Sequence, residues 1–255
     1  MLLVIDVGNT NTVIGVYNQD TLMEDWRIRT VRDKTADEFN VLARALFADR
    51  GIDPSAIAKT VISSVVPAAV PILDAFCKRY LKLEPLWIEP VAVKQLMPIL
   101  YKNPGEVGAD RIVNAIGAYH KYRTAMIIID FGTATTFDVV TQKGEYRGGN
   151  IVPGIMISAE ALFQRASRLP RVEIFKVPEQ VIGNTTIESM QSGIIYGNAA
   201  MVDGMVARMA QEMETRPKVI ATGGLASLIA GVSETIESVD QSLTLEGLRI
   251  ISREL

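Results

Sequence analysis

The chain has 255 residues, of which 48% are apolar and 22% charged, and it carries a formal net charge of −3. This length suits one large domain or two small ones. The sequence has no basic run of the kind that binds nucleic acid, and no apolar run near the ~18 residues of a membrane span. The first residues, MLLVIDVGN, are typical of a core strand rather than of a signal peptide. We therefore expect a cytoplasmic protein that has neither a nucleic acid nor a membrane as its partner.

The chain holds a single cysteine and a single histidine. One cysteine excludes an internal disulfide framework, and Cys77 is predicted to be a small buried residue of a helix. His120 is predicted near the end of a helix, where a cation interacts favourably with the helix dipole. A Ser-His-Asp triad or a histidine-based metal site would depend on this one residue, so both kinds of site are disfavoured.

The first half of the chain is predicted to alternate strands with helices. The strands are expected at Leu2–Asp6, Thr12–Tyr17, Met23–Thr30, Thr60–Val66, Leu86–Ile88 and Met97–Tyr101. The helices are expected from Thr35 toward Arg50, from Pro67 to Leu81, and over Ala109–Tyr122. Thr35 and Glu38 have the spacing of a capping box, which begins the first of these helices, and Gly51 ends it.

The second half repeats this plan. Strands are expected at Met126–Asp130, Thr135–Val140, Glu145–Val152 and Lys218–Thr222. Helices are expected from Gly154 to before Pro170, over Ile187–Met213, and after Gly224. The expected fold is therefore α/β with two similar lobes, residues 1–116 and residues 117–255. Small residues between Ser192 and Gly204 let helices pack closely, either at an interface or inside the fold.

Two segments of similar sequence support this duplication. VIDVGNTNTVIGV, residues 4–16, recurs 124 positions later as IIDFGTATTFDVV, residues 128–140. The identical pairs are Ile5/Ile129, Asp6/Asp130, Gly8/Gly132, Thr12/Thr136 and Val16/Val140. Each segment is typical of a strand, a tight turn and a second strand, which brings an aspartate and turn amides to one place. Turn amides with nearby hydroxyl groups suit phosphate oxygens, so we interpret the pair as two phosphate-binding hairpins that face each other across a cleft. The alternative is two ordinary hairpins that share Gly and Thr because turns need them.

A third element, VIATGGL at residues 219–225, predicts a strand that ends in two glycines and opens a helix. Backbone without side chains at Gly223 and Gly224 lets an adenine or a ribose approach closely. The alternative is an ordinary tight turn between a strand and a helix. The chain contains neither the P-loop pattern nor the glycine spacing of the Rossmann motif, which excludes those two nucleotide sites as written.

A charged turn begins the helix predicted at residues 109–122. It reads Gly108-Ala109-Asp110-Arg111, and Tyr101, Asn103 and Gly105 precede it. A carboxylate in a first helical turn commonly serves only to stabilise the helix dipole. Phosphoryl transfer, however, requires a carboxylate that accepts a hydroxyl proton and, beside it, a positive charge such as an arginine that binds an anion.

Taken together, these motifs resemble a known family. DVGNTNT, GADR, DFGTATT, GGNIVPGI and ATGGLA occur in this order over nearly the whole chain, which is similar to the type III pantothenate kinases. The resemblance implies two ribonuclease-H-like lobes with a nucleotide cleft between them, as in sugar kinases and actin. It implies phosphorylation of pantothenate by ATP to 4′-phosphopantothenate, the first step of coenzyme A biosynthesis. It also implies a homodimer, Mg²⁺ or a similar divalent ion with ATP, and a need for K⁺ or NH₄⁺.

The resemblance further implies a role for each motif. Asp110 would accept the proton of the pantothenate hydroxyl, with Arg111 beside it to bind substrate and the transferring phosphate. Asp130 would bind the monovalent cation. The ATP-binding residues would be Asp6 (through the divalent ion), Val7, Gly8, Asn9, Thr10, Asn11, Thr12, Val13, Gly132, Thr133, Gly223 and Gly224. The pantothenate pocket would comprise Tyr101, Gly108, Ala109, Asp110, Arg111 and Thr185.

Two rival functions belong to the same predicted fold. The first is another small-molecule kinase, acting on a sugar or a short carboxylate, although such sugar kinases usually have longer chains. The second is a nucleotide-sensing regulator or a transcription accessory protein. The presence of Asp110 and of both hairpins counts against the second, as does the absence of a basic run.

Overall fold

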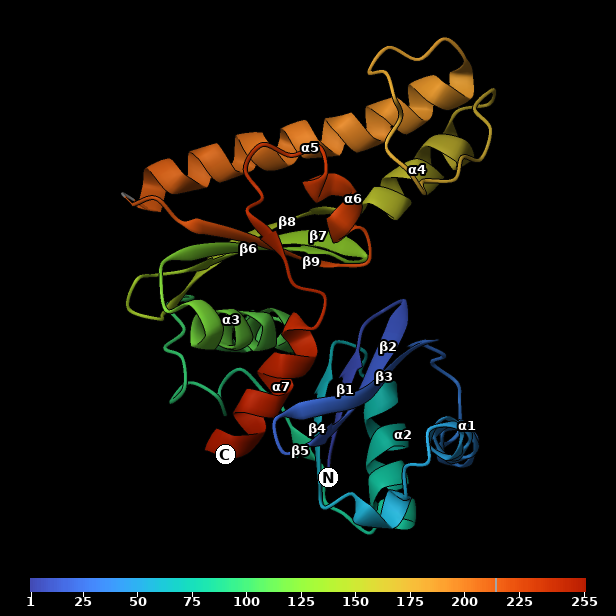
Figure 1. Ribbon diagram of the computed structural model, residues 1–255, viewed down its shortest axis with the longest axis vertical. Coiled ribbons are helices and arrows are strands. Elements are labelled where there is room, and N and C mark those ends of the chain that lie inside the picture. The colour runs from blue at the N-terminus through green and yellow to red at the C-terminus, as the bar shows by residue number, and fades with distance from the viewer. Residues whose placement is uncertain (214) are drawn as a thin grey trace. The chain divides into compact units, whose positions relative to one another are not determined.

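A computed structural model describes residues 1–213 and 215–255, and the chain divides into two compact units (Figure 1). The first unit comprises Met1–Lys121 together with Leu243–Leu255, and the second comprises Tyr122–Ser242. The change from the first unit to the second therefore falls five residues after the predicted boundary at residue 116. The last helix belongs to the first unit, whereas the sequence analysis placed it in the second lobe.

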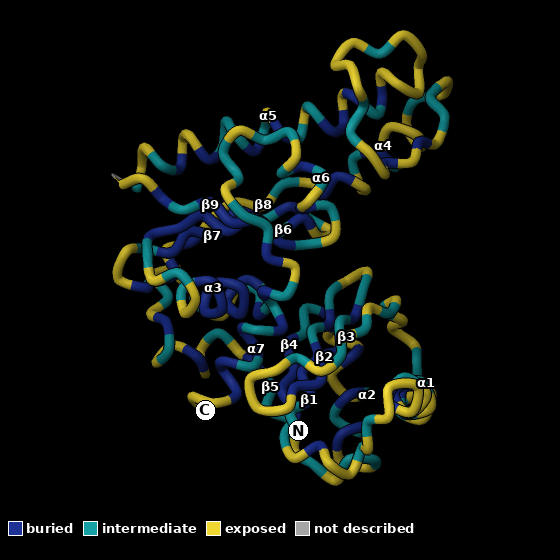
Figure 2. Tube along the Cα trace, in the orientation of Figure 1, coloured by how far each residue is buried: buried dark blue, intermediate teal, exposed yellow. Residues whose placement is uncertain are grey.

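The first unit is built on a five-stranded sheet in the order β3-β2-β1-β4-β5. Its strands are β1 (Leu2–Val7), β2 (Asn11–Asn18), β3 (Thr21–Arg29), β4 (Lys59–Ser64) and β5 (Leu86–Trp87). β1 is antiparallel to β2 and parallel to β4, so that a hairpin and a crossover meet at the central strand. Burial follows this order, because β1 and β4 are almost wholly buried while β3 alternates between exposed and half-buried residues (Figure 2).

Four longer helices belong to the first unit. They are α1 (Ala36–Asp49), α2 (Ala69–Phe76), α3 (Ala109–Tyr122) and α7 (Leu243–Glu254), with shorter turns at Pro54–Ala56, Cys77–Leu81 and Pro104–Glu106. The predicted capping box begins α1, since Thr35 accepts from the Glu38 amide and Glu38 accepts from the Thr35 amide. α1 and α2 pack apolar side chains on the face of the sheet that carries Leu3, Ile5 and Val7.

The second unit is built on a five-stranded sheet in the order β10-β9-β6-β7-β8. Its strands are β6 (Met126–Phe131), β7 (Ala134–Val140), β8 (Tyr146–Pro153), β9 (Lys218–Gly223) and β10 (Ser238–Val239). Its helices are α4 (Ile155–Arg165), α5 (Thr186–Met213) and α6 (Ala226–Ala230), and their apolar side chains form one core with the sheet. None of the described helices is both long enough and apolar enough to cross a membrane.

The duplication predicted from the sequence is confirmed by the topology. In each unit the first three strands form an antiparallel meander, and the fourth and fifth lie parallel to the first. The third strand bulges at the same place in both units, because the register with the second strand shifts between Val16 and Tyr17 and again between Val139 and Val140. These two shifts are 123 residues apart.

That spacing corrects the alignment of the two hairpins. Val7 pairs with Thr12 across the first turn, whereas Phe131 pairs with Thr135 across the second. The first turn therefore holds residues 8–11 and the second only residues 132–134. The constant 124-residue spacing paired Thr12 with Thr136, but by strand pairing Thr12 corresponds to Thr135, because one residue is missing from the second turn.

Two other sequence expectations differ from the structure. Residues 97–101 form no strand, since residues 91–96 make successive turns and Pro98 has no amide hydrogen to donate to a sheet. The sequence analysis also left the end of the chain undivided, whereas β10 and α7 occupy it. α7 contacts β1, β4 and β2 of the first unit.

α3 and α7 lie in backbone contact with each other. A Cβ atom on Gly247 would lie 2.2 Å from the carbonyl oxygen of Val113, and one on Gly117 would lie 2.9 Å from that of Leu243. Thr244 adds a hydrogen bond of 2.7 Å to Asn114. The helix that begins at the charged turn is therefore held by the last helix of the chain.

Candidate active site

The first predicted phosphate loop follows β1. Asp6 lies one residue before the end of that strand, and the amide of Gly8 donates to the carbonyl of Asn11 at 3.0 Å, which closes the turn. Arg32 donates from its guanidinium to Oδ1 of Asn9 at 3.2 Å. The turn therefore presents short polar side chains and backbone amides at the carboxyl end of the central strand, where α/β folds commonly bind ligands.

Asp110 lies at the same edge of the same sheet. A Cβ atom on Gly108 would be 2.6 Å from Oδ1 of Asp110 and 3.7 Å from a methyl group of Val65. Val65 directly follows β4, and its amide donates to the carbonyl of Val7 at 3.1 Å. The first turn of α3 is thus set against the ends of β1 and β4, and the catalytic aspartate expected from the sequence lies in the unit that carries Asp6.

The protein environment of Asp110 favours the protonated form of its carboxyl group, compared with the same group in water. Burial raises the pKa of this carboxyl, and the backbone amide and the charge of Arg111 oppose the rise without cancelling it. Oδ1 accepts from the Arg111 amide at 2.8 Å. The Arg111 side chain is also buried, so a cation and a carboxyl with an elevated pKa share the start of one helix. A carboxylate of raised pKa is a better proton acceptor than an exposed one.

The second predicted hairpin places its aspartate in the same way. Asp130 lies one residue before the end of β6, opposite Thr222 of β9. A Cβ atom on Gly223 would lie 2.6 Å from Oδ1 of Asp130, and one on Gly132 would lie 3.6 Å from it. Gly223 also has φ of +93°, a conformation that favours glycine. Asp130, Gly132 and Gly223 are therefore brought together.

Gly224 differs from its neighbour, because a Cβ atom on it would meet nothing within 4 Å. Thr133 forms the middle of the short turn, and its carbonyl lies against Gly154. This open backbone at the end of β9 is compatible with the close approach of a flat group. The two glycines therefore have different roles. Gly223 leaves room for the Asp130 carboxylate, and Gly224 leaves open space beside the turn.

The residues expected to bind pantothenate are divided between the units. Tyr101, Gly108, Ala109, Asp110 and Arg111 belong to the first unit, and Thr185 belongs to the second. Tyr101 is 37% exposed, in the irregular segment before α3. Thr185 lines an open pocket of about 710 Å³ between α4 and α5, together with Asn184, Ser189 and Asn198.

The sequence analysis missed two hydroxyl groups beside the first loop. Ser63 pairs with Asp6 in the parallel register of β4, is fully buried, and has no hydrogen-bond partner for its hydroxyl among the described residues. Thr30 follows β3 and contacts the loop directly. Neither carries a sequence signal of its own, because a hydroxyl at the end of a strand is common. Only the pairing of the strands brings them to the loop.

Comparison with known proteins identifies the family. The family model described as type III pantothenate kinase matches residues 2–208. A type III pantothenate kinase of Desulforapulum autotrophicum is 71% identical over 252 residues, which cover 99% of this chain and 96% of the relative. A type III pantothenate kinase of Desulfatibacillum aliphaticivorans is 61% identical over 251 residues, with 98% and 97% covered.

Solved structures of low identity share the fold. A Campylobacter jejuni protein classed with the Baf family of transcriptional activators has a TM-score of 0.61 and 17% identity, with 99% of this chain and 98% of that chain covered. A ROK family glucokinase from Streptomyces griseus, solved with glucose and AMPPNP, has a TM-score of 0.52 and 15% identity, with 99% and 100% covered. These likenesses support the ribonuclease-H-like, duplicated α/β fold. The chain belongs to the type III pantothenate kinase family, and its reaction is the ATP-dependent phosphorylation of pantothenate in coenzyme A biosynthesis.

Proposed function

We propose that Asp110 is the general base of this reaction and that the loop from Asp6 to Val13 holds the phosphates of ATP. The observation that supports this assignment is the common position of Asp6 and Asp110 at the carboxyl ends of β1 and β4, within one unit. A base and a phosphate loop that share one rigid sheet edge keep a fixed distance from each other. Phosphoryl transfer depends mainly on such positioning and on neutralisation of charge.

In the proposed step, the terminal hydroxyl of pantothenate attacks the γ-phosphorus of ATP. Its oxygen forms a bond to phosphorus, its proton passes to the carboxylate of Asp110, and the bond from phosphorus to the β,γ-bridging oxygen breaks to release ADP. Arg111 neutralises negative charge on the transferring group. The elevated pKa of Asp110 suits a group that must take a proton from an alcohol.

We further assign Asp6 to the divalent ion that accompanies ATP. Among the residues that the structure describes, no three His, Cys, Asp or Glu side chains form a group that would hold a metal ion by themselves. Mg²⁺ in kinases is commonly bound by one or two carboxylates together with substrate phosphates, and a single carboxylate at the phosphate loop fits that pattern. When bound, the ion neutralises charge on the phosphates.

Asp130 is proposed to bind K⁺ or NH₄⁺. Its carboxylate lies against Gly132 and Gly223, and backbone carbonyl oxygens of Phe131 and Ala134 lie near the same two glycines. A monovalent cation prefers such oxygen ligands, and it would stabilise the second hairpin against the negative charge of ATP. Thr133 would contact ATP, and Gly223 and Gly224 would border the adenosine.

Tyr101, Gly108, Ala109 and Thr185 are each proposed to contact pantothenate, as are Asp110 and Arg111. Asn184 and Ser189, which border the same pocket as Thr185, add polar groups that suit the amide and hydroxyl groups of pantothenate. We also propose that the enzyme acts in the cytoplasm, where ATP is at hand.

A homodimer is proposed through the second unit. Large apolar side chains are exposed there, among them Phe175 at 79%, Val181 at 63% and Ile182 at 81%. A Cβ atom on Gly193 or Gly197 of α5 would meet nothing within 4 Å outside its own stretch of helix, so the described residues do not pack against α5 at these two positions. Monomers rarely expose extended apolar surface, and a second copy would cover it.

A coupled assay of ADP release tests the reaction and its ions together. The protein is supplied with ATP, Mg²⁺ and pantothenate, with and without K⁺. We expect turnover that requires pantothenate and that rises on addition of K⁺ or NH₄⁺. Glucose serves as the comparison acceptor for the rival sugar kinase, and turnover with glucose but not with pantothenate would overturn the assignment.

A further inference from the structure

Thr30 contacts the first phosphate loop through both its hydroxyl group and its backbone amide. Its hydroxyl donates to the carbonyl of Gly8 at 2.8 Å, and its amide donates to the carbonyl of Thr10 at 2.9 Å. The residue follows directly after Arg29, which pairs with Asn11 at the start of β2. One residue therefore holds two carbonyl groups of the turn.

These two bonds also determine where the loop amides point. In a trans peptide the C=O and the following N–H point in opposite directions, and the described residues include no cis peptide bond. When Thr30 holds the carbonyls of Gly8 and Thr10 on its own side, the amides of Asn9 and Asn11 are directed away from it. Two amides set in this way make a cradle for phosphate oxygens.

Thr12 extends this contact into a chain of two hydrogen bonds. Its Oγ1 lies 2.9 Å from Oγ1 of Thr30. A hydroxyl group has one proton to donate, and that of Thr30 goes to the Gly8 carbonyl, so the hydroxyl of Thr12 must donate to Thr30. Hydrogen bonds in such a chain polarise one another, which strengthens the bond that reaches the loop.

In the second hairpin of the same chain, the turn is stabilised without these hydroxyl hydrogen bonds. The residue that follows the last paired position of β8 is Gly154, in the place that Thr30 has after β3. A Cβ atom on Gly154 would lie 2.1 Å from the carbonyl oxygen of Thr133, so no side chain fits there. Thr135, the counterpart of Thr12, is fully buried and its hydroxyl has no partner among the described residues. The second turn is held by close backbone packing, whereas the first is held by a hydroxyl group.

We propose that Thr30 is a positioning residue for ATP, which sets the amides of Asn9 and Asn11 for the phosphates through its bonds to Gly8 and Thr10. The inference rests on the proposed role of the loop from Asp6 to Val13. Thr30 itself is not proposed to touch the substrate. Thr30 acts through the loop. The second hairpin has no such residue, and it is proposed to bind a different ion and a different part of ATP.

The test compares Thr30→Val, which keeps the branched shape and removes the hydroxyl, with Thr30→Ser, which keeps the hydroxyl. KM for ATP and for pantothenate, kcat, and ATP binding by calorimetry are measured for each. For Thr30→Val we expect KM and Kd for ATP to rise about ten-fold, the effect of one lost hydrogen bond to the loop, with KM for pantothenate unchanged. Thr30→Ser should remain within about three-fold of the parent for ATP.

Thr21→Val is the matched control, because Thr21 is exposed at the other end of β3 and lies far along the strand from the loop. It should leave KM for ATP unchanged. If Thr30→Val does not fold, Thr30→Ala makes the same deletion with a smaller side chain. The inference is overturned if a folded Thr30→Val or Thr30→Ala binds ATP normally, or if Thr30→Ser is as impaired as they are.

Asp6→Asn separates this inference from the assignment of the loop. If Asp6→Asn and Thr30→Val both leave ATP binding unchanged, the phosphate loop has been placed wrongly and Thr30 loses its role with it. If Asp6→Asn weakens ATP binding in the presence of Mg²⁺ and Thr30→Val does not, the loop stands and only the role of Thr30 is refuted.

Discussion

Gly108 leaves the space that the carboxylate of Asp110 occupies, since a Cβ atom at position 108 would lie 2.6 Å from Oδ1 of Asp110. The same relationship recurs between Gly223 and Asp130, again at 2.6 Å. In both units an aspartate proposed to act in the reaction therefore lies directly against a glycine. The absence of a side chain at these two positions decides where each carboxylate points.

Gly108→Ala is expected to keep the fold and to lower kcat by about 10²-fold, because the new methyl group displaces the Asp110 carboxylate by a fraction of an ångström to one ångström. The measurement is kcat beside the melting temperature. Gly105→Ala is the control, since a Cβ atom there would meet only Asn103 Oδ1, at 3.7 Å. A Gly108→Ala enzyme with normal kcat would mean that the position of this carboxylate does not matter.

Asp110→Asn should fold normally and lose most turnover, about 10²–10⁴-fold in kcat, because the amide keeps the shape and cannot accept the proton. The pH dependence follows from the raised pKa. Activity needs the ionised carboxylate, so kcat/KM of the parent should fall as the pH drops through a pKa above the ordinary value of 3.8. An Asp110→Asn variant with near-normal kcat, or an acid limb below that value, would exclude Asp110 as the base.

Asp130→Asn should raise the K⁺ concentration needed for half-maximal activity and leave the Mg²⁺ dependence little changed. The reason is the different surroundings of the two aspartates, since Asp6 lies at the first loop and Asp130 lies against Gly132 and Gly223. Titrations of K⁺ and Mg²⁺ with both enzymes check this. The assignment is wrong if the Mg²⁺ requirement moves instead and K⁺ affects neither enzyme.

Gly197→Leu tests the proposed dimer. Apart from its own stretch of helix backbone, a Cβ atom at this position would meet none of the described residues within 4 Å, so leucine should cost the isolated subunit little. It should, however, separate two helices that approach each other there. An overpacked interface costs about 1–3 kcal/mol or more, and we expect a shift toward monomer in sedimentation together with a loss of pantothenate binding. A monomer with full activity would make the dimer incidental, and an active dimer would place the interface elsewhere.

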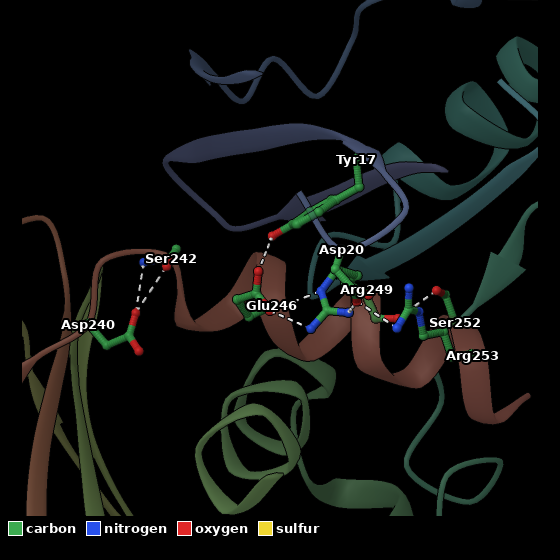
Figure 3. A network of polar contacts seen from close by, with 8 residues as sticks. All are labelled: Tyr17, Asp20, Asp240, Ser242, Glu246, Arg249, Ser252 and Arg253. Carbon is green, nitrogen blue, oxygen red and sulfur yellow. Dashed lines mark hydrogen bonds and ion pairs between the residues drawn. The ribbon is translucent and has the colours of Figure 1, made fainter. Parts of the chain in front are cut away.

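Tyr17→Phe tests the attachment of α7 to the first sheet (Figure 3). Tyr17 donates to Glu246 at 3.0 Å, and Arg249 connects Glu246 with Asp20. Losing this hydrogen bond should lower the free energy of unfolding by about 1 kcal/mol at neutral pH, as measured by urea denaturation. Such a loss would show that the last helix is anchored to β2 through this contact.

The same tyrosine predicts an effect of alkaline pH. Burial, with the negative charge of Glu246, raises the pKa of Tyr17 above its ordinary value of 10.0. The neutral phenol therefore contributes stability that is fully present below pH 10 and is lost as the pH rises beyond it, because the unfolded chain then ionises more readily. Tyr17→Phe should lose less stability than the parent between pH 10 and pH 11. Equal losses in the two proteins would contradict the raised pKa.

Much of the local structure around the candidate site could be predicted from the sequence because its signals are local. The strand before Asp6, the turn at Gly8, and the capped helix after Thr35 each depend on residues within a few positions of one another. The same holds for the strand and turn around Asp130, and the repetition of one pattern made the duplication visible. The prediction of a strand at residues 97–101 was wrong for a local reason too, since Pro98 has no amide hydrogen to donate to a sheet.

The sequence by itself determined the class of fold, the two hairpins, the charged turn and, through their order, the family. The tertiary structure decided which residues meet. Pairing of β2 with β3 brings Thr30 to Gly8, parallel pairing of β4 brings Ser63 to Asp6, and contact between Gly117 and Gly247 holds α7 on the first unit. These neighbours are 22 to 130 residues apart in the chain. No local pattern specifies them, because strand order and the packing of helices on the sheet are set by the burial of apolar surface over the whole unit.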